Sequence, residues 1–197
     1  MARLFVAVEM PPALAADLLR LVPAQRGIRP TPPTQLHLTL RFLGEHDEPM
    51  AARIDAALRA AMVPPTLSPT LSPMSLQVQG VGRFRGRQGA ILWAGLADSP
   101  PLLALFKAIS TALETIGIAP EGRRFWPHLT LARCRPEVPE RVLRDWLAAH
   151  KELSLPPWDV GSFVLFESFL DRQGARHQMR ASYRLEGSAE GAAEGSD

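Results

Sequence analysis

Apolar residues recur along the chain with two different spacings, and these spacings predict which segments are strands and which are helices. Alternating apolar and polar residues, or a short apolar run between turn residues, indicate a strand. Apolar residues three or four positions apart indicate a helix, as at Leu102, Leu105 and Ile109. The predicted strands are 4–8, 35–43, 76–84, 90–96, 124–132, 159–170 and 178–185. The predicted helices are 12–21, 47–62, 100–116 and 139–150.

The order of these elements repeats itself. Strand, helix, strand, helix and strand occur once before about residue 90 and approximately again after it. An internal duplication makes two related lobes, and a pseudo-two-fold axis can bring corresponding strands face to face. The sequence therefore predicts an α+β fold, with mostly antiparallel sheets lining a central cleft and helices on their outer faces. We expect residues 1–186 to form a single domain of two interleaved lobes, with the boundary near residue 90.

Two segments interrupt this pattern. Residues 63–75 contain four prolines and the sequence TLSP twice in succession. Proline has no backbone N–H for a sheet ladder, so we predict an irregular or edge segment there. Residues 187–197 (GSAEGAAEGSD) are mostly small or acidic and have no apolar period. Such a composition cannot offset the entropy of ordering, so we predict a disordered acidic tail.

Composition narrows the class of protein. The 197 residues are 46% hydrophobic and 21% charged, which is enough for a domain with a real core. No apolar run reaches the roughly 20 residues that a bilayer span needs. The single cysteine, Cys134, rules out an intrachain disulfide and suits a reducing compartment, so we expect a cytoplasmic protein. We also expect it to be a monomer. Without its acidic tail the chain is more basic than its net charge of +2, which is compatible with a phosphate-bearing ligand.

The tetrapeptide HLTL occurs at 37–40 and again at 128–131, although the chain has only 5 histidines. Successive side chains on a strand point to opposite faces. His37 and Thr39 therefore share one face, about 6–7 Å apart along the strand, and the two leucines are buried behind them. The second copy has the same arrangement. An ordinary solvated sheet face would explain one copy, but two copies at matching places in a duplicated plan favour a cleft.

Two histidines facing each other across a cleft suit the cleavage of a phosphodiester. That reaction needs a base to activate the nucleophile and an acid to protonate the leaving oxygen. One imidazole can be neutral and another protonated near neutral pH, so His37 and His128 can divide these roles, although the motifs alone do not order them. The hydroxyls of Thr39 and Thr130 can donate to phosphate oxygens. Zinc and two-metal ligand spacings are absent around both histidines, so no metal or other cofactor is predicted.

At this point the chain resembles a known family, the 2H phosphoesterases, which are named for two His-x-Thr-x motifs. The likeness is to the branch of RNA 2′,3′-cyclic phosphodiesterases (LigT/ThpR-like), historically called 2′-5′ RNA ligases. It covers nearly the whole of residues 1–186. The stretches on which it rests are RLFVAVEMP, QLHLTLRFLGE, ILWAGL, RFWPHLTLAR and FVLFESFL.

The resemblance implies a bilobal α+β fold with both histidines in the central cleft. It implies hydrolysis of a terminal 2′,3′-cyclic phosphate on RNA to a 2′-phosphomonoester, without a metal ion, and a reversible 2′-5′ joining of certain RNAs. By resemblance His37 is the proton donor and His128 the proton acceptor. Expected partners are RNA with 2′,3′-cyclic phosphate ends or small cyclic nucleotides. The alternatives are a non-catalytic RNA- or nucleotide-binding module, and an enzyme for 2′-5′-linked oligonucleotides or other small cyclic phosphates.

Two arginines follow the motifs and are candidate phosphate ligands. Arg41 continues the alternation of His37 and Thr39, so we expect it to reach the cleft. Arg133 is an odd number of residues from His128, so on a regular strand its side chain points to the opposite face, and only a bulge would bring it to the same one. The resemblance nevertheless favours Arg133, because the second motif of the family commonly ends in this arginine.

The sequence GVGRFRGRQG at 80–89 lacks the spacing of a phosphate-binding loop and reads as a hairpin. In it, Phe84 can stack on a base while the arginines at 83, 85 and 87 meet an RNA backbone. An exposed basic turn without a function is the alternative. The remaining histidines, His46, His150 and His177, have no threonine partner and are interpreted as surface or capping residues.

Overall fold

The computed structural model describes residues 1–62, 72–171 and 174–185 of the chain. Within these ranges it contains ten strands, four α-helices and one short 3-10 helix. The predicted acidic tail and most of the doubled TLSP sequence lie outside the described residues, so both remain predictions.

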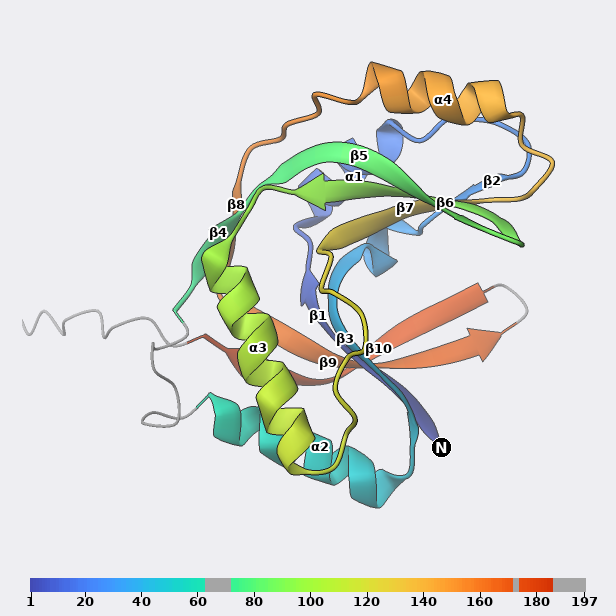
Figure 1. Ribbon diagram of the computed structural model, residues 1–197. Helices are drawn as coiled ribbons and strands as arrows, with labels where there is room; N and C mark the ends of the chain where they lie inside the picture. Colours follow the sequence, from blue (N-terminus) through green and yellow to red (C-terminus); the bar gives the residue numbers. More distant parts are fainter. Residues whose placement is uncertain (63–71, 172–173, 186–197) are drawn as a thin grey trace, which may run out of the picture.

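The elements alternate along the chain much as the sequence indicates (Figure 1). The strands are β1 (Ala2–Glu9), β2 (Ile28–Pro30), β3 (His37–His46), β4 (Met74–Leu76), β5 (Val78–Gly86), β6 (Gly89–Leu96), β7 (His128–Cys134), β8 (Trp158–Val160), β9 (Ser162–Asp171) and β10 (Gly174–Arg184). The helices are α1 (Pro12–Arg20), α2 (Glu48–Ala61), α3 (Pro100–Thr115), α4 (Glu140–Ala149) and the 3-10 helix η1 (Pro33–Gln35).

All four predicted helices are confirmed, with ends that agree within one residue. Two of them begin at side chains that cap the first turn. The Asp47 carboxylate accepts a hydrogen bond from the Met50 backbone N–H at 2.9 Å, and the Ser99 hydroxyl accepts one from Leu102 at 3.4 Å. Because each cap satisfies a backbone N–H that has no partner inside the helix, it fixes where the helix begins.

The strands were predicted less accurately at their ends. The strand expected over 124–132 begins only at His128, because Pro127 has no N–H to offer a ladder. Residues 28–35, between the first predicted helix and the first HLTL copy, hold β2 and η1, which the sequence did not predict. The strand expected over 159–170 is divided at Gly161 into β8 and β9.

Eight strands form one antiparallel sheet in the order β10-β9-β1-β3-β7-β6-β5, with β2 also paired to β7. The strands β4 and β8 form a separate two-stranded sheet. Helices α2 and α3 contact each other and pack beside β1, β3 and β10, whereas α4 lies over the half that holds β5, β6 and β7 (Figure 1). The α+β fold with antiparallel strands is confirmed.

The two halves of the sheet interleave in sequence. The N-terminal strand β1 pairs with β9 from the C-terminal part, and β5 and β6 form a hairpin that straddles residue 90. Residue 90 therefore lies inside one half and does not separate the two. Trp146 of α4 donates a hydrogen bond from Nε1 to the Leu21 carbonyl just after α1, at 2.7 Å, which joins distant parts of the chain in the same half.

The two HLTL copies meet at the centre of the sheet. Leu38 of β3 is the Cα partner of Leu129 of β7 in an antiparallel pair. The leucines of both motifs, Leu38, Leu40, Leu129 and Leu131, belong to the buried core. The histidines and threonines between them are only partly buried. The predicted division of each motif into a buried leucine face and an accessible polar face is therefore confirmed.

Candidate active site

His37 and His128 are held in the same way. His37 Nδ1 lies 2.7 Å from the Gln35 carbonyl oxygen, and His128 Nδ1 lies 2.7 Å from the Trp126 carbonyl oxygen. A carbonyl can only accept, so each Nδ1 carries the hydrogen. In the neutral ring this leaves Nε2 as the unprotonated nitrogen, available for proton transfer. Each copy of the motif thus fixes both the orientation and the tautomer of its imidazole with its own backbone.

Each motif contains a β-bulge at its second leucine. In β3, Ala7 pairs with Thr39 but Val6 pairs with Arg41, so Leu40 is the extra residue. In β7, Trp93 pairs with Thr130 but Leu92 pairs with Ala132, so Leu131 is the extra residue. A bulge reverses the alternation of faces beyond it. The two copies therefore share the bulge as well as the HLTL sequence.

The first bulge turns Arg41 away from the histidine face. Arg41 pairs with Val6, which lies on the opposite side of β1 from the partner of Thr39. The arginine is only 3% exposed and donates hydrogen bonds to the Ser110 hydroxyl at 3.3 Å and to the Ala119 carbonyl. The alternation counted for Arg41 was wrong, because the strand is not regular. Its side chain nevertheless lines a cavity together with Trp93, so its contact with phosphate stays a prediction.

Phe42 takes the place that was expected for Arg41. It pairs with Phe5, two residues from the partner of Thr39, and its ring centroid lies 6.0 Å from that of Phe5. The ring is 66% exposed. A large exposed aromatic side chain next to Phe5 offers a flat apolar surface on the histidine face.

The second bulge brings Arg133 onto the face of His128 and Thr130. Arg133 pairs with Ile91, which is two residues from Trp93, the partner of Thr130. On the other side of β7, Arg133 pairs with Arg29 of β2, and both arginines are exposed. The bulge at Leu131 thus explains how Arg133 shares a face with His128 although the two are an odd number of residues apart.

Thr31 stabilises that bulge. Its backbone N–H donates to the Leu131 carbonyl at 2.8 Å, and its hydroxyl donates to the Thr130 carbonyl at 2.6 Å. Both carbonyls belong to the irregular part of β7, where the ladder supplies fewer partners. Thr31 therefore holds the bulged backbone that determines which way the Arg133 side chain points.

Aromatic rings surround His128. Phe84 of β5 lies edge-on to the imidazole with ring centroids 4.9 Å apart, and Trp93 of β6 lies 6.3 Å away. Trp93 lies flat over Gly82, where an added Cβ would come within 2.1 Å of the indole ring. Phe84 therefore lies beside the second motif, where a ring that stacks on a base is expected. Gly82 is required at its position because any side chain there would collide with the Trp93 indole.

His37 has a more apolar setting. Its ring centroid lies 4.9 Å from that of Phe5 and 6.3 Å from that of Phe166. Burial lowers the pKa of His37 from 6.5 to about 4, although the hydrogen bond to Gln35 acts the other way. His37 is therefore neutral at pH 7 in the free protein.

The sequence interpretation missed His177. This residue of β10 lies edge-on to His37, with ring centroids 5.3 Å apart and an interplanar angle of 86°. It was interpreted as a surface or capping residue because it has no threonine partner, and the last strand was predicted to begin only at Gln178. Had the strand been extended to Gly174, alternation with Met179 would have placed His177 on a definite face, but not beside His37.

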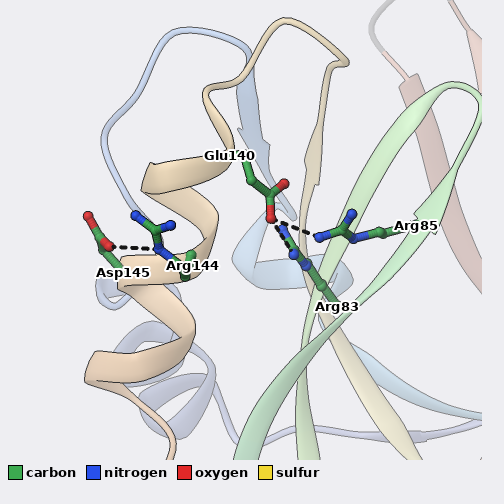
Figure 2. A network of polar contacts seen from close by, with 5 residues as sticks. All are labelled: Arg83, Arg85, Glu140, Arg144 and Asp145. Atoms are coloured by element: carbon green, nitrogen blue, oxygen red, sulfur yellow. Dashed lines mark hydrogen bonds and ion pairs between the residues drawn. The ribbon is translucent and has the colours of Figure 1, made fainter.

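Arg83 and Arg85 of the β5–β6 hairpin point to the other face, toward α4. Figure 2 shows Arg83 and Arg85 reaching Glu140, whose carboxylate oxygen lies 2.5 Å and 2.8 Å from their guanidinium nitrogens. The hydrogen bond from Arg83 holds the pKa of Glu140 below its usual range. Arg83 and Arg85 thus join the hairpin to α4, and contact of the hairpin arginines with RNA stays a prediction.

A cavity of about 690 Å³ adjoins the site. It lies between α3, the end of β6 and the segment 120–127, and Trp93 both lines it and packs against His128. Neither HLTL histidine lines this cavity, whereas Arg41 does.

The described residues contain neither a metal-binding cluster nor a membrane-spanning helix. Within residues 1–62, 72–171 and 174–185, no group of three or more His, Cys, Asp or Glu side chains has the arrangement to hold a metal ion. In the same part of the chain, no helix is long and apolar enough to cross a membrane.

Known proteins resemble this chain over most of its length. A protein named RNA 2′,3′-cyclic phosphodiesterase from Archaeoglobus fulgidus is 28% identical over 176 residues, covering 87% of this chain and 94% of that protein. One with the same name from Thermus thermophilus is 28% identical over 201 residues, covering 94% and 91%.

Solved structures show the same fold. The crystal structure of a protein from Thermus thermophilus superimposes with a TM-score of 0.77 at 26% identity, covering 95% of this chain and 100% of that one. Escherichia coli LigT complexed with 3′-AMP gives a TM-score of 0.71 at 22% identity, covering 93% and 98%. The family model described as the 2′-5′ RNA ligase superfamily matches residues 10–170. The resemblance read from the two motifs is thus confirmed, and the chain belongs to the 2′-5′ RNA ligase superfamily.

Proposed function

We propose that this protein hydrolyses the terminal 2′,3′-cyclic phosphate of RNA to a 2′-phosphomonoester, with His37 and His128 as acid and base. The observation that supports this best is the paired arrangement of the two imidazoles. Each is fixed through Nδ1 to a carbonyl two residues before it, and the strands that hold them are joined at Leu38 and Leu129. Curated relatives that bear the name of this activity support the substrate.

In the proposed reaction, water attacks the phosphorus atom and the bond from phosphorus to the ribose 3′ oxygen breaks. His128 Nε2 accepts a proton from the attacking water, and protonated His37 donates its Nε2 proton to the departing 3′ oxygen. The phosphate stays on the 2′ oxygen. His37 ends neutral and His128 ends protonated, and exchange with solvent restores the starting states.

The low pKa of His37 makes its acid role depend on substrate. In the free protein His37 is neutral at pH 7, because burial lowers its pKa to about 4. An anionic phosphate placed at Nε2 favours the imidazolium and raises that pKa. The acid is therefore created when the cyclic phosphate binds, which couples protonation to the presence of substrate.

The other side chains of the face stabilise the phosphate and the base. The Thr39 and Thr130 hydroxyls donate to non-bridging oxygens as negative charge grows in the transition state. Arg133 supplies positive charge on the His128 side. Phe84 offers its ring to a nucleobase.

The same arrangement supports 2′-5′ joining. A 5′ hydroxyl of a second RNA can take the place of the attacking water: His128 accepts its proton, the bond from phosphorus to the 3′ oxygen breaks, and His37 protonates that oxygen. The reverse cleavage, in which the 3′ hydroxyl attacks and the 5′ oxygen departs, exchanges the two proton roles. All these groups come from one chain, so a monomer contains the complete site. We place the activity in the cytoplasm, where the Cys134 thiol stays reduced.

The decisive experiment uses RNA oligomers with 2′,3′-cyclic ends, incubated with the protein in the presence of EDTA. We expect conversion to 2′-phosphate ends, and a bell-shaped pH profile from the coupled histidines. His37→Ala and His128→Ala should each abolish turnover, whereas the matched variant His150→Ala, just after α4 and outside the site, should keep it. Undiminished turnover by either of the first two variants contradicts the proposal. Binding of oligonucleotides without hydrolysis favours a non-catalytic module.

A further inference from the structure

His177 approaches His37 from a distant strand. The strands β9 and β1 lie between β10 and β3 in the sheet, yet the two imidazole centroids are only 5.3 Å apart. Phe5 of β1 contacts both rings, with its centroid 4.8 Å from that of His177 and 4.9 Å from that of His37. The curved sheet thus brings a third histidine to the half of the site that holds the proposed acid.

The nitrogen atoms of His177 are not equivalent. Nδ1 is buried and has no hydrogen-bond partner within the described parts of the chain. A hydrogen on this atom would be a buried donor without an acceptor, which costs more than an unused lone pair. Burial also lowers the pKa of His177, which favours the neutral ring. The single ring hydrogen therefore belongs on Nε2.

This tautomer is the opposite of the one found at His37. His37 uses its Nδ1–H on the Gln35 carbonyl and presents an unprotonated Nε2. His177 presents an Nε2–H donor from the neighbouring ring. Among the described residues that contact His177 or pair with it, Phe5 and Phe166 are apolar, and Ser168, opposite His177 on β9, is uncharged.

We propose that His177 is a substrate-positioning residue, whose Nε2–H donates a hydrogen bond to an oxygen of the phosphate group on which His37 acts. The inference rests on the proposed function and adds a third imidazole to it. It also makes the cleft asymmetric, because the neighbours of His128 on the other side are Phe84 and Trp93. The phosphate is then drawn toward His37, with the 3′ oxygen facing the acid.

The test compares three variants with the wild-type protein. His177→Phe keeps a ring on Phe5 but removes the donor, and His177→Gln places an amide N–H near the position of Nε2. His150→Phe is the matched control, since His150 packs against Trp146 outside the site. With 2′,3′-cyclic AMP, we expect about a tenfold loss of kcat/KM for His177→Phe, the effect of one lost hydrogen bond. We expect His177→Gln to recover most of it and His150→Phe to match wild type.

Calorimetric titration with adenosine 2′-phosphate, the product, tests the same bond without turnover. We expect weaker binding by His177→Phe than by the Gln variant. Wild-type kcat/KM and wild-type product affinity in His177→Phe would overturn the proposal. So would equal losses in both variants with lowered melting temperatures, because those indicate a packing role. If the wild type turns over no cyclic phosphate, the proposed function fails, and the titration alone then decides the role of His177.

Discussion

Leu38 of β3 is the Cα partner of Leu129 of β7, so the two HLTL motifs meet at their second residues. Counting outward from this antiparallel pair, the histidine of each motif comes opposite the threonine of the other. The pair of leucines lies at the centre of the sheet and is fully buried. The spacing of the proposed catalytic groups therefore depends on a hydrophobic contact behind them.

Leu129→Ala tests that dependence. Removing a fully buried leucine side chain at the junction should lower the free energy of unfolding by about 2–5 kcal/mol. The folded fraction should also turn over substrate more slowly, because the strands can shift relative to each other. Urea unfolding and initial rates measure the two effects. Leu103→Ala, at a side chain that is 43% exposed, is the control, and a Leu129 variant as stable and active as this control contradicts the idea.

The threonines should affect chemistry and leave folding intact. Thr39→Val and Thr130→Val keep the shape of the side chain but remove the hydroxyl donor, so we expect kcat to fall by about 10- to 100-fold. Thr→Ser at the same positions keeps the donor and should retain most of the rate. Steady-state kinetics with melting curves separate the outcomes. Equal rates for the valine and serine variants would show that the hydroxyls do not contact the reacting phosphate.

His37 should make the fold sensitive to acid. Its folded-state pKa of about 4 lies below the unfolded value of 6.5, so as pH falls through this window the unfolded chain takes up the proton first. The stability is therefore complete above pH 6.5 and is lost as pH falls toward 4. Between pH 7 and 4.5 the wild type should lose about 2 kcal/mol more than His37→Gln, which cannot titrate. Denaturant unfolding at the two pH values measures the difference, and parallel losses in both proteins would count against a buried neutral imidazole.

The two arginines after the motifs should behave in opposite ways. Arg133→Ala should fold normally, bind RNA ends more weakly and reduce the slope of log affinity against log salt by about one. Arg41→Ala removes donors that are buried against Ser110 and the Ala119 carbonyl, so it should cost about 2–4 kcal/mol of stability. Salt titrations of RNA binding and urea unfolding distinguish the pair. If instead Arg133→Ala lowers the stability and Arg41→Ala weakens RNA binding, the bulges do not determine the faces of these two arginines.

The sequence by itself determined the elements and the paired motifs. Helix periodicity and capping residues are local, so the four helices were predicted almost to the residue. The alternation inside HLTL is also local, which is why His37, Thr39, His128 and Thr130 were assigned to accessible faces correctly. The family followed from the same motifs and their flanking stretches.

Only the tertiary structure decided which further residues join the site. The residue pattern of a bulged strand does not differ from that of a regular strand. The faces on which Arg41 and Arg133 lie were therefore decided by their pairing with β1 and β6. His177 reaches His37 because the sheet curves, and curvature comes from packing between elements far apart in the chain. Periodicity reports which way a side chain points along one strand, whereas long-range pairing determines what it meets there.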